Sequence, residues 1–380
     1  MWKTILFPGK YMQGAGALAE LPALVKRFGS HGLVLASPTA YTALLPQSGL
    51  EGNAHSLPVE RFGGECCERE LARVAAIIQE KHVDVVVGMG GGKTIDTAKI
   101  AADRAHVPVL VVPTIASTDA PCSGCAVVYS EQGVFDAVQY QTSNPAAVLV
   151  DTAVIAQAPV RFLVAGMGDA LATWFEAQAC SATQAPNECG GLSTLTGLTL
   201  AKLCYDTLLQ YGATAKLAAA QHLTTPALER IVEANILLSG VGFESGGLAS
   251  AHSIHNGLTA LDETHAYYHG EKVAFGVLAG LQLTDAPPDE SARVFAFCET
   301  VGLPTTLADL GLGTVDRTRL RRVAEKACAP GEYIHHEAGT ITPDNVLQAM
   351  LAANAIGEHR KQQLNSRRSA ETCDGGAGHG

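Results

Sequence analysis

The first half of the chain alternates short apolar runs with amphipathic segments. Four of the runs are rich in β-branched residues and closely bounded by Gly or Pro, a pattern typical of buried strands. These expected strands lie at 31–36, 83–87, 107–112 and 147–150. Between them, apolar residues recur at helical spacing over 70–81 and 94–104. Strands that alternate with helices predict a parallel sheet with helices on both faces.

The pattern changes after about Pro159, where long stretches rich in Ala and Leu replace the strand-like runs. The expected buried helices lie at 168–180, 192–210, 226–238 and 273–283. We therefore expect an α/β domain at 1–158 and an all-helical domain at 159–370. The Gly-rich end of the chain, 371–380, is expected to be disordered.

Composition limits the classes of protein to which the chain can belong. The net charge of −11 over 380 residues disfavours nonspecific nucleic-acid binding, which needs basic side chains. No apolar run reaches the 18 residues typical of a membrane span, and Ile5–Phe7 is too short for a signal-peptide core. The ten cysteines are scattered, as in cytosolic enzymes. We expect a cytoplasmic protein without nucleic-acid or membrane partners, and its low charged fraction of 17% suggests surface buried between subunits.

The strongest local motif is the run GMGGGKT at 88–94, which follows one expected strand and opens a helix. Consecutive glycines let backbone N–H groups approach a phosphate at a helix N-terminus. The run fails the P-loop pattern, because Val87 stands where the first Gly is needed. It also fails G-x-G-x-x-G, because Lys93 holds the last position. A pyrophosphate cradle of another lineage is favoured over a plain glycine turn.

Two further motifs have alternative interpretations. Cys122 and Cys125 have C-x-x-C spacing, but no second such pair or thioredoxin-like context accompanies them, so a redox or zinc role is disfavoured. Asp169 and four histidines could hold a metal, because one carboxylate and two imidazoles with an open position make a catalytic zinc site. The histidines are His252, His255, His265 and His269. Alternatively, Asp169 caps a helix and the histidines are core residues, and spacing alone does not choose among them.

Seven segments resemble the iron-containing alcohol dehydrogenase family, in its zinc-using glycerol dehydrogenase branch. They are PGKYMQGAGAL (8–18), FGGEC (62–66), GGGKTIDTAK (90–99), PTIASTDAPCS (113–123), GMGDALATWFEA (166–177), GVGFESGGLASAHSIHNGLTA (240–260) and YYHGEKVAFG (267–276). The resemblance implies a dehydroquinate synthase-like fold, with an N-terminal α/β dinucleotide-binding domain and an all-α C-terminal domain.

The resemblance also implies the residues of the site. The implied metal ligands are Asp169, His252 and His269, with one zinc ion per subunit, and Asp119 is the implied catalytic carboxylate that binds substrate hydroxyls. The implied NAD contacts are Gly92, Lys93, Thr94 and Asp96 at the phosphates, and Thr114, Ser117, Ser123, Cys125 and Tyr129 further along. The iron-preferring branch has a fourth ligand, a His, where this chain has Thr173. His255 and His265 then match histidines that are not ligands.

The implied activity is reversible, NAD-dependent oxidation of glycerol to dihydroxyacetone by metal-assisted hydride transfer. The resemblance also implies a homo-oligomer, because relatives form octamers. Other interpretations are a preference for another vicinal diol such as 1,2-propanediol, a phosphorylated substrate, or a non-catalytic nucleotide-binding regulatory protein. One position departs from the family. Ser37 stands where relatives carry an Asp that binds the adenosine ribose, so we expect NAD to be preferred with weaker exclusion of NADP.

Overall fold

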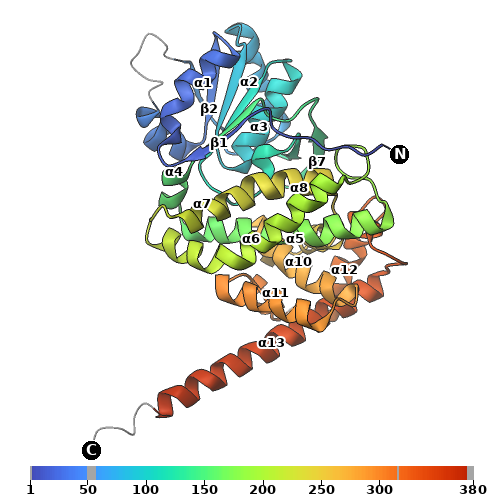
Figure 1. Ribbon diagram of the computed structural model, residues 1–380. Coiled ribbons are helices and arrows are strands. Elements are labelled where there is room, and N and C mark those ends of the chain that lie inside the picture. The colour runs from blue at the N-terminus through green and yellow to red at the C-terminus, as the bar shows by residue number, and fades with distance from the viewer. Residues whose placement is uncertain (1, 49–56, 315, 375–380) are drawn as a thin grey trace, which may run out of the picture. The chain divides into compact units, whose positions relative to one another are not determined.

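The computed structural model describes residues 2–48, 57–314 and 316–374 (Figure 1). Contacts within the chain group it into two compact units, Met1–Gly247 (unit 1) and Leu248–Gly380 (unit 2). The boundary expected at 158/159 is placed where the sequence pattern changes from strands to helices, and not by contacts. The expected division into domains stays a prediction. Of the tail expected at 371–380, the first four residues continue the last helix, and 375–380 lie outside the described residues.

Unit 1 contains a six-stranded sheet in which every neighbouring pair is parallel. Its strands are β1 (Tyr11–Gly14), β2 (Gly32–Ala36), β3 (Val59–Arg61), β4 (Val85–Gly90), β5 (Val109–Pro113) and β8 (Ala147–Asp151), in the order β1-β8-β5-β4-β2-β3. The four expected runs form β2, β4, β5 and β8. The parallel α/β architecture predicted from the sequence is therefore confirmed.

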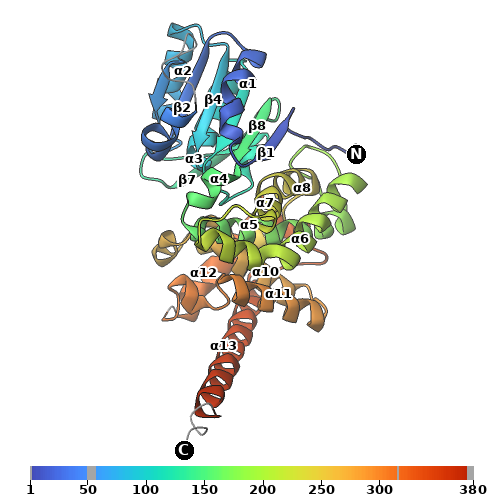
Figure 2. The same ribbon diagram turned by 60° about the vertical axis from the view of Figure 1, so that its left-hand side comes forward.

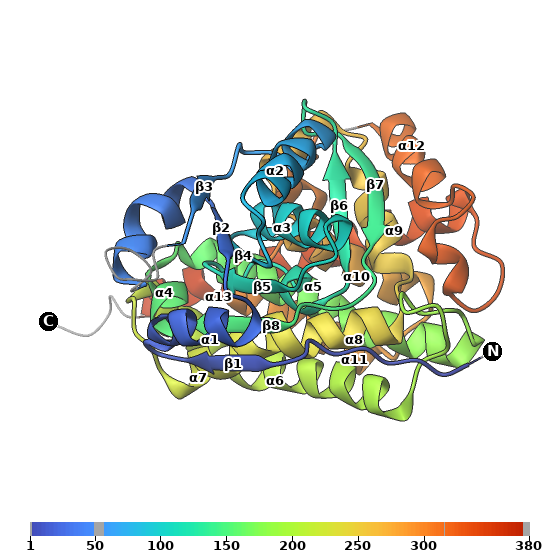
Figure 3. The same cartoon turned by 90° about the horizontal axis from the view of Figure 1, so that it is seen from above.

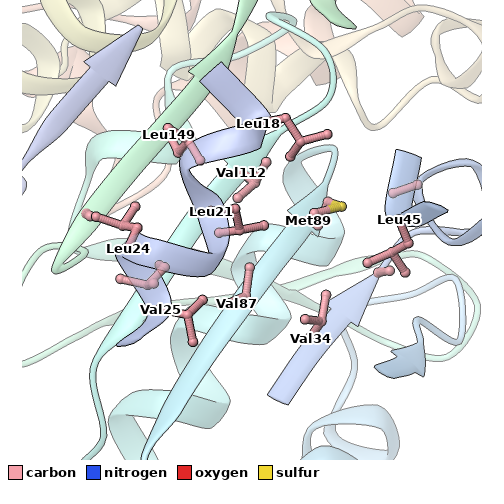
Figure 4. Close-up of a cluster of buried hydrophobic side chains, with 14 of the residues drawn as sticks. Leu18, Leu21, Leu24, Val25, Val34, Leu45, Val87, Met89, Val112 and Leu149 are labelled. Carbon is pink, nitrogen blue, oxygen red and sulfur yellow. The ribbon is translucent and has the colours of Figure 1, made fainter. Parts of the chain in front are cut away.

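Helices cover both faces of this sheet (Figure 3). Helix α1 (Leu21–Phe28) lies on one face, and α2 (Glu68–Glu80) and α3 (Gly92–Arg104) lie on the other. Leu21 of α1 packs with Val87 and Met89 of β4 in a cluster of fully buried side chains (Figure 4). Each such side chain contributes about 1.5–3 kcal/mol when it is removed from water. The core therefore fixes the strands whose carboxyl ends carry the candidate site.

Two smaller features complete the α/β part. An antiparallel hairpin of β6 (Cys125–Tyr129) and β7 (Phe135–Tyr140) follows a 3₁₀ turn at Ala120–Cys122. Asp151 ends β8 and caps α4 (Thr152–Gln157), since its carboxylate accepts from the N–H groups of Ala153 and Val154. The same carboxylate also accepts from the backbone N–H groups of Gly16 and Leu18. Asp151 thus connects the start of α4 to the segment that carries Gly16 and Leu18, which is a structural role.

The rest of unit 1 is helical, and one of its helices begins earlier than the sequence pattern predicts. Its main helices are α5 (Val160–Thr183), α6 (Leu195–Ala220), α7 (Pro226–Glu233) and α8 (Ser239–Gly246), with a π-helical turn at Ala234–Leu238. The prediction that a helix starts near Gly168 was wrong, because α5 begins eight residues earlier. Asp169 therefore lies inside the helix and does not cap it. Helices α6 and α8 both pack against α5.

Unit 2 is a helical bundle centred on α10. Its helices are α9 (Ser250–Leu258), α10 (His269–Leu283), α11 (Pro288–Val301), α12 (Arg317–Ala327) and α13 (Pro343–Asp374). Helix α10 contacts α9, α11 and α13, and the C-terminal turns of α13 extend away from the other helices of this unit (Figure 2). Among the described residues, no helix combines the length and apolar character needed to cross a membrane.

Candidate active site

The glycine run joins β4 to α3 at the carboxyl edge of the parallel sheet. Two of its glycines are required by packing. A Cβ at Gly88 would lie 2.6 Å from the Cβ of Ala98, and one at Gly90 would lie 2.8 Å from Thr94. These glycines let strand and helix approach closely, a role that glycine also has in dinucleotide-binding α/β folds.

Gly92 differs, because packing does not require it to lack a side chain. A Cβ there would meet only the hydroxyl of Thr118, at 3.8 Å, which is an ordinary contact. Gly92 is the first residue of α3, and the first N–H groups of an α-helix have no acceptor within the helix. Its backbone can therefore be approached by an anion at a helix end that favours negative charge.

Lys93 and Tyr129, both implied cofactor contacts, lie together beside this turn. The Lys93 ammonium lies 4.9 Å from the centre of the Tyr129 ring. It also pairs with the carboxylate of Glu65 at 2.5 Å. Burial raises the pKa of the Tyr129 hydroxyl, so this side chain stays neutral at ordinary pH. Any anion that takes Lys93 as a partner competes with Glu65.

Asp96 and Ser123 meet at a buried lysine that the sequence analysis did not single out. Asp96 accepts from the N–H of Val127 in β6, and its other oxygen lies 3.7 Å from the Lys99 ammonium. Burial raises the pKa of Asp96, and Lys99 opposes that shift. Lys99 also donates to the hydroxyl of Ser123 and to the carbonyls of Ala120 and Cys125. Lys99 thus connects α3 to the turn before β6. In the sequence, only its i, i+3 spacing from Asp96 could have indicated that the two side chains form an ion pair.

The thiols of Cys122 and Cys125 are both free. Burial raises the pKa of Cys125 to about 12, and Cys122 shifts in the same direction. A thiol with a raised pKa is a poor nucleophile and a poor metal ligand at neutral pH. That the C-x-x-C spacing carries no redox or zinc chemistry stays a prediction.

Three more implied cofactor residues follow strands of the sheet. Ser37 comes directly after β2, donates its N–H to the carbonyl of Met89, and lies beside Gly90. Thr114 comes directly after β5 and donates its N–H to the carbonyl of Gly90. Ser117 lies further along the same loop and is half-buried. Ser37 and Thr114 therefore flank the end of β4, at the edge where ligands bind to open α/β sheets.

Asp119 is held by a hydroxyl from α8. Ser239 donates to the Asp119 carboxylate at 2.7 Å, and the Ser239 oxygen lies 2.9 Å from the Thr173 hydroxyl of α5. Ser239 and Thr173 are buried, whereas Asp119 is only partly buried. The partly exposed carboxylate can therefore accept a hydrogen bond from a small molecule while its orientation is fixed from behind.

The loop that carries Asp119 is fixed to α5 by backbone contacts. A Cβ at Gly166 would lie 2.0 Å from the carbonyl oxygen of Ala116, so only Gly fits. The amide of Asn235 donates to that same carbonyl and to the carbonyl of Leu163. Gly166 and Asn235 thus set the position of the loop relative to the helix that carries Asp169, three residues after Gly166.

Asp169, His252 and His269 form a candidate metal group. Each offers one ligand atom, and these atoms all lie within 4.8 Å of one another. Within the described ranges this is the one such group of His, Cys, Asp or Glu side chains. Asp169 is 1% exposed, and a carboxylate with two imidazoles is the donor set of many catalytic zinc sites. The residues therefore fit a divalent metal, and their role as ligands stays a prediction.

The two other histidines have different surroundings. His255 Nε2 lies 3.0 Å from His269 Nδ1, and the two rings pack edge to face. Burial lowers the pKa of His255 well below its usual value, and the neighbouring His269 and Lys272 lower it further. His265 lies apart from this cluster and contacts the carbonyl of Thr259 through Nε2. The structure thus groups the histidines that spacing alone could not distinguish.

Comparison with known proteins places the chain in a family. Residues 8–152 match the family model described as iron-containing alcohol dehydrogenase. The glycerol dehydrogenase of Thermotoga maritima is 52% identical over 95% of this chain and 99% of its own length. That of Pseudomonas putida is 50% identical over 94% of this chain and 99% of its own length. The chain belongs to the iron-containing alcohol dehydrogenase family.

A solved structure extends the likeness to the fold. The crystal structure of a probable glycerol dehydrogenase from Sinorhizobium meliloti 1021 superposes with a TM-score of 0.89 at 45% identity. The match covers 94% of this chain and 99% of that one. The family and fold expected from the seven segments are therefore confirmed.

Proposed function

We propose that the chain is an NAD-dependent glycerol dehydrogenase that interconverts glycerol and dihydroxyacetone with a zinc ion at Asp169, His252 and His269. The observation that carries the proposal is the grouping of these three ligand atoms within 4.8 Å. Relatives named glycerol dehydrogenase at 50–52% identity over nearly the full chain support the activity. A metal-free regulatory role has no use for such a donor set.

The residues of the glycine turn bind the coenzyme in this proposal. The backbone at Gly92 and the N-terminus of α3 receive the pyrophosphate, and Lys93 exchanges Glu65 for a phosphate oxygen. Ser37 and Thr114 lie on either side of the end of β4 and line the path of the nucleotide. NAD held by these residues would supply the hydride acceptor.

Asp119 orients the polyol. Its carboxylate accepts a hydrogen bond from a substrate hydroxyl, while Ser239 keeps the carboxylate in one orientation. A bond to a charged acceptor contributes about 1.5–3 kcal/mol, which favours a triol or diol over a simple alcohol. A divalent metal supplies Lewis acidity at the reacting hydroxyl. Asp169, His252 and His269 determine where that acidity acts.

The substrate alternatives differ in what they require of the site. A phosphorylated substrate needs additional basic groups; Lys272 lies near the histidine ligands in sequence, but it is 7% exposed and burial lowers its pKa. A diol such as 1,2-propanediol lacks one hydroxyl that Asp119 would hold. We expect kcat/KM with NAD to fall in the order glycerol, 1,2-propanediol, glycerol phosphate. A higher kcat/KM for 1,2-propanediol than for glycerol would show that the enzyme prefers another vicinal diol.

The proposal includes a homo-oligomer, an octamer by resemblance, that works in the cytoplasm. Large apolar side chains on unit 1 support burial against other subunits, since Trp2, Leu195 and Leu217 are each more than two-thirds exposed in the single chain, at 86%, 80% and 69%. The scattered cysteines support a reducing compartment. Sedimentation of the purified protein tests the assembly.

A further inference from the structure

A line of polar side chains in unit 2 leads to His269 from a residue outside the candidate active site. Asn256 Nδ2 donates to Glu332 Oε2 at 3.0 Å. Asn256 Oδ1 lies 3.1 Å from His255 Nδ1. His255 Nε2 lies 3.0 Å from His269 Nδ1. We infer that Glu332 and Asn256 are positioning residues that fix the ring tautomer of His269, so that its Nε2 offers a lone pair to the metal.

The direction of each hydrogen bond follows from the chemistry of Glu332. A carboxylate only accepts, so the Asn256 group that faces Glu332 must be the NH₂, and its carbonyl oxygen must face His255. That oxygen also only accepts, so Nδ1 of His255 carries the proton. A neutral imidazole has one N–H, which leaves Nε2 of His255 as an acceptor for the Nδ1–H of His269.

The opposite orientation of the amide would have the opposite result. With the Asn256 NH₂ against His255, Nδ1 of His255 would accept and its Nε2 would carry the proton. His269 would then accept at Nδ1 and carry its own proton on Nε2. A ring nitrogen that carries a proton cannot bind a metal, so the carboxylate at the far end decides whether His269 is ready to act as a ligand.

The segment that carries Glu332 is fixed against the helix that carries Asn256 and His255. Glu332 directly precedes the 3₁₀ turn Tyr333–His336. The N–H of Ile334 in that turn donates to the hydroxyl of Ser253 in α9 at 2.8 Å. Glu332 is only partly buried, so solvent reaches the position of its side chain. Glu332 and Asn256 are 76 residues apart, and the docked turn is what brings them together.

The inference rests on the proposed metal role of His269, and zinc affinity tests both separately. Zinc is titrated into the metal-free full chain against a competing chelator, for the wild type, Glu332→Ala and Asn256→Leu. Loss of partners that orient metal ligands typically costs about 10–100-fold in metal affinity. We expect about 10-fold weaker binding for Glu332→Ala and a larger loss for Asn256→Leu. The matched control is Glu358→Ala, because Glu358 accepts from the amide of Asn354 at 3.0 Å in α13.

A double variant separates the tautomer role from simple packing. Asn256→Asp with Glu332→Gln exchanges donor and acceptor, so the new carboxylate still accepts from His255 and from the new amide. We expect zinc affinity within about 3-fold of wild type, well inside the 10–100-fold loss expected of a broken chain. Wild-type zinc affinity in Glu332→Ala, or no recovery in the double variant, would overturn the inference. If the wild type itself binds no zinc, the proposed metal site fails instead.

Discussion

Ser239 donates its hydroxyl hydrogen to the carboxylate of Asp119, at 2.7 Å. A hydroxyl has one hydrogen, so the Thr173 hydroxyl, 2.9 Å from the Ser239 oxygen, must be the donor in that second contact. The chain runs from Thr173 through Ser239 to Asp119. It links Asp119, the proposed substrate-binding residue, to α5, one turn after Asp169. Thr173 is the position at which the resemblance implies a fourth ligand in the iron-preferring branch.

Removal of the Ser239 hydroxyl is expected to loosen Asp119 without disturbing the coenzyme. Ser239→Ala should lower kcat/KM for glycerol by about 10-fold, the low end for a bond to a charged group, and should leave the KM for NAD unchanged. Steady-state kinetics with each substrate varied in turn measure both values. Ser193→Ala is the control, because Ser193 donates to a backbone carbonyl at 2.7 Å. Equal kinetics for the two variants would remove Ser239 from the site.

Replacement of Asp119 tests the substrate contact itself. Asp119→Asn keeps the shape of the side chain but removes its charge, so kcat/KM for glycerol should fall by about 10–100-fold. The affinity for NAD, measured by the quenching of protein fluorescence, should change little. If NAD and glycerol weaken together, Asp119 acts on the coenzyme or on folding.

Gly92 separates a packing role from a binding role. Gly92→Ala fits the structure, because its Cβ would contact only Thr118, at 3.8 Å. We expect an unchanged melting temperature and a KM for NAD raised on the order of 10-fold, since the methyl group displaces a phosphate from the backbone. Gly14→Ala, where a Cβ would meet nothing within 4 Å, is the control. A wild-type KM in Gly92→Ala would place the pyrophosphate elsewhere.

Coenzyme choice depends on Ser37 in this account. A serine can bind a ribose hydroxyl but has no charge that repels the 2′-phosphate of NADP. Ser37→Asp should therefore raise the ratio of kcat/KM for NAD to that for NADP by about 10-fold, mainly through weaker use of NADP. The two coenzymes are compared at saturating glycerol. An unchanged ratio would mean that residue 37 does not face the ribose.

The sequence predicted most of the sheet but little of what positions the site. The strands that form β2, β4, β5 and β8 are continuous apolar runs, which a buried parallel sheet requires. The short strands β1 and β3 were missed because they have only four and three residues. The start of α5 was missed because Gly166 and Gly168 weaken a helical pattern, whereas Gly166 is required by the carbonyl of Ala116.

The sequence did not predict the contacts that position the site, because they join residues that are far apart in the chain. Lys99 binds the turn before β6, Ser239 binds Asp119 from 120 residues away, and Glu332 reaches Asn256. No local spacing encodes such pairs, because they depend on how helices pack. The residue types of the candidate metal group were visible in the sequence, but the distinction between His255 and His269 needed the resemblance or the structure.

The most direct test of the account is NADH formation from glycerol and NAD before chelation, after chelation, and after zinc is added back. We expect turnover to be lost with the metal and restored by zinc in the wild type. His252→Ala should retain little zinc and gain no activity from added zinc, because one of its inner ligands is missing. Full turnover in the metal-free wild type, or full zinc occupancy in His252→Ala, would contradict the account.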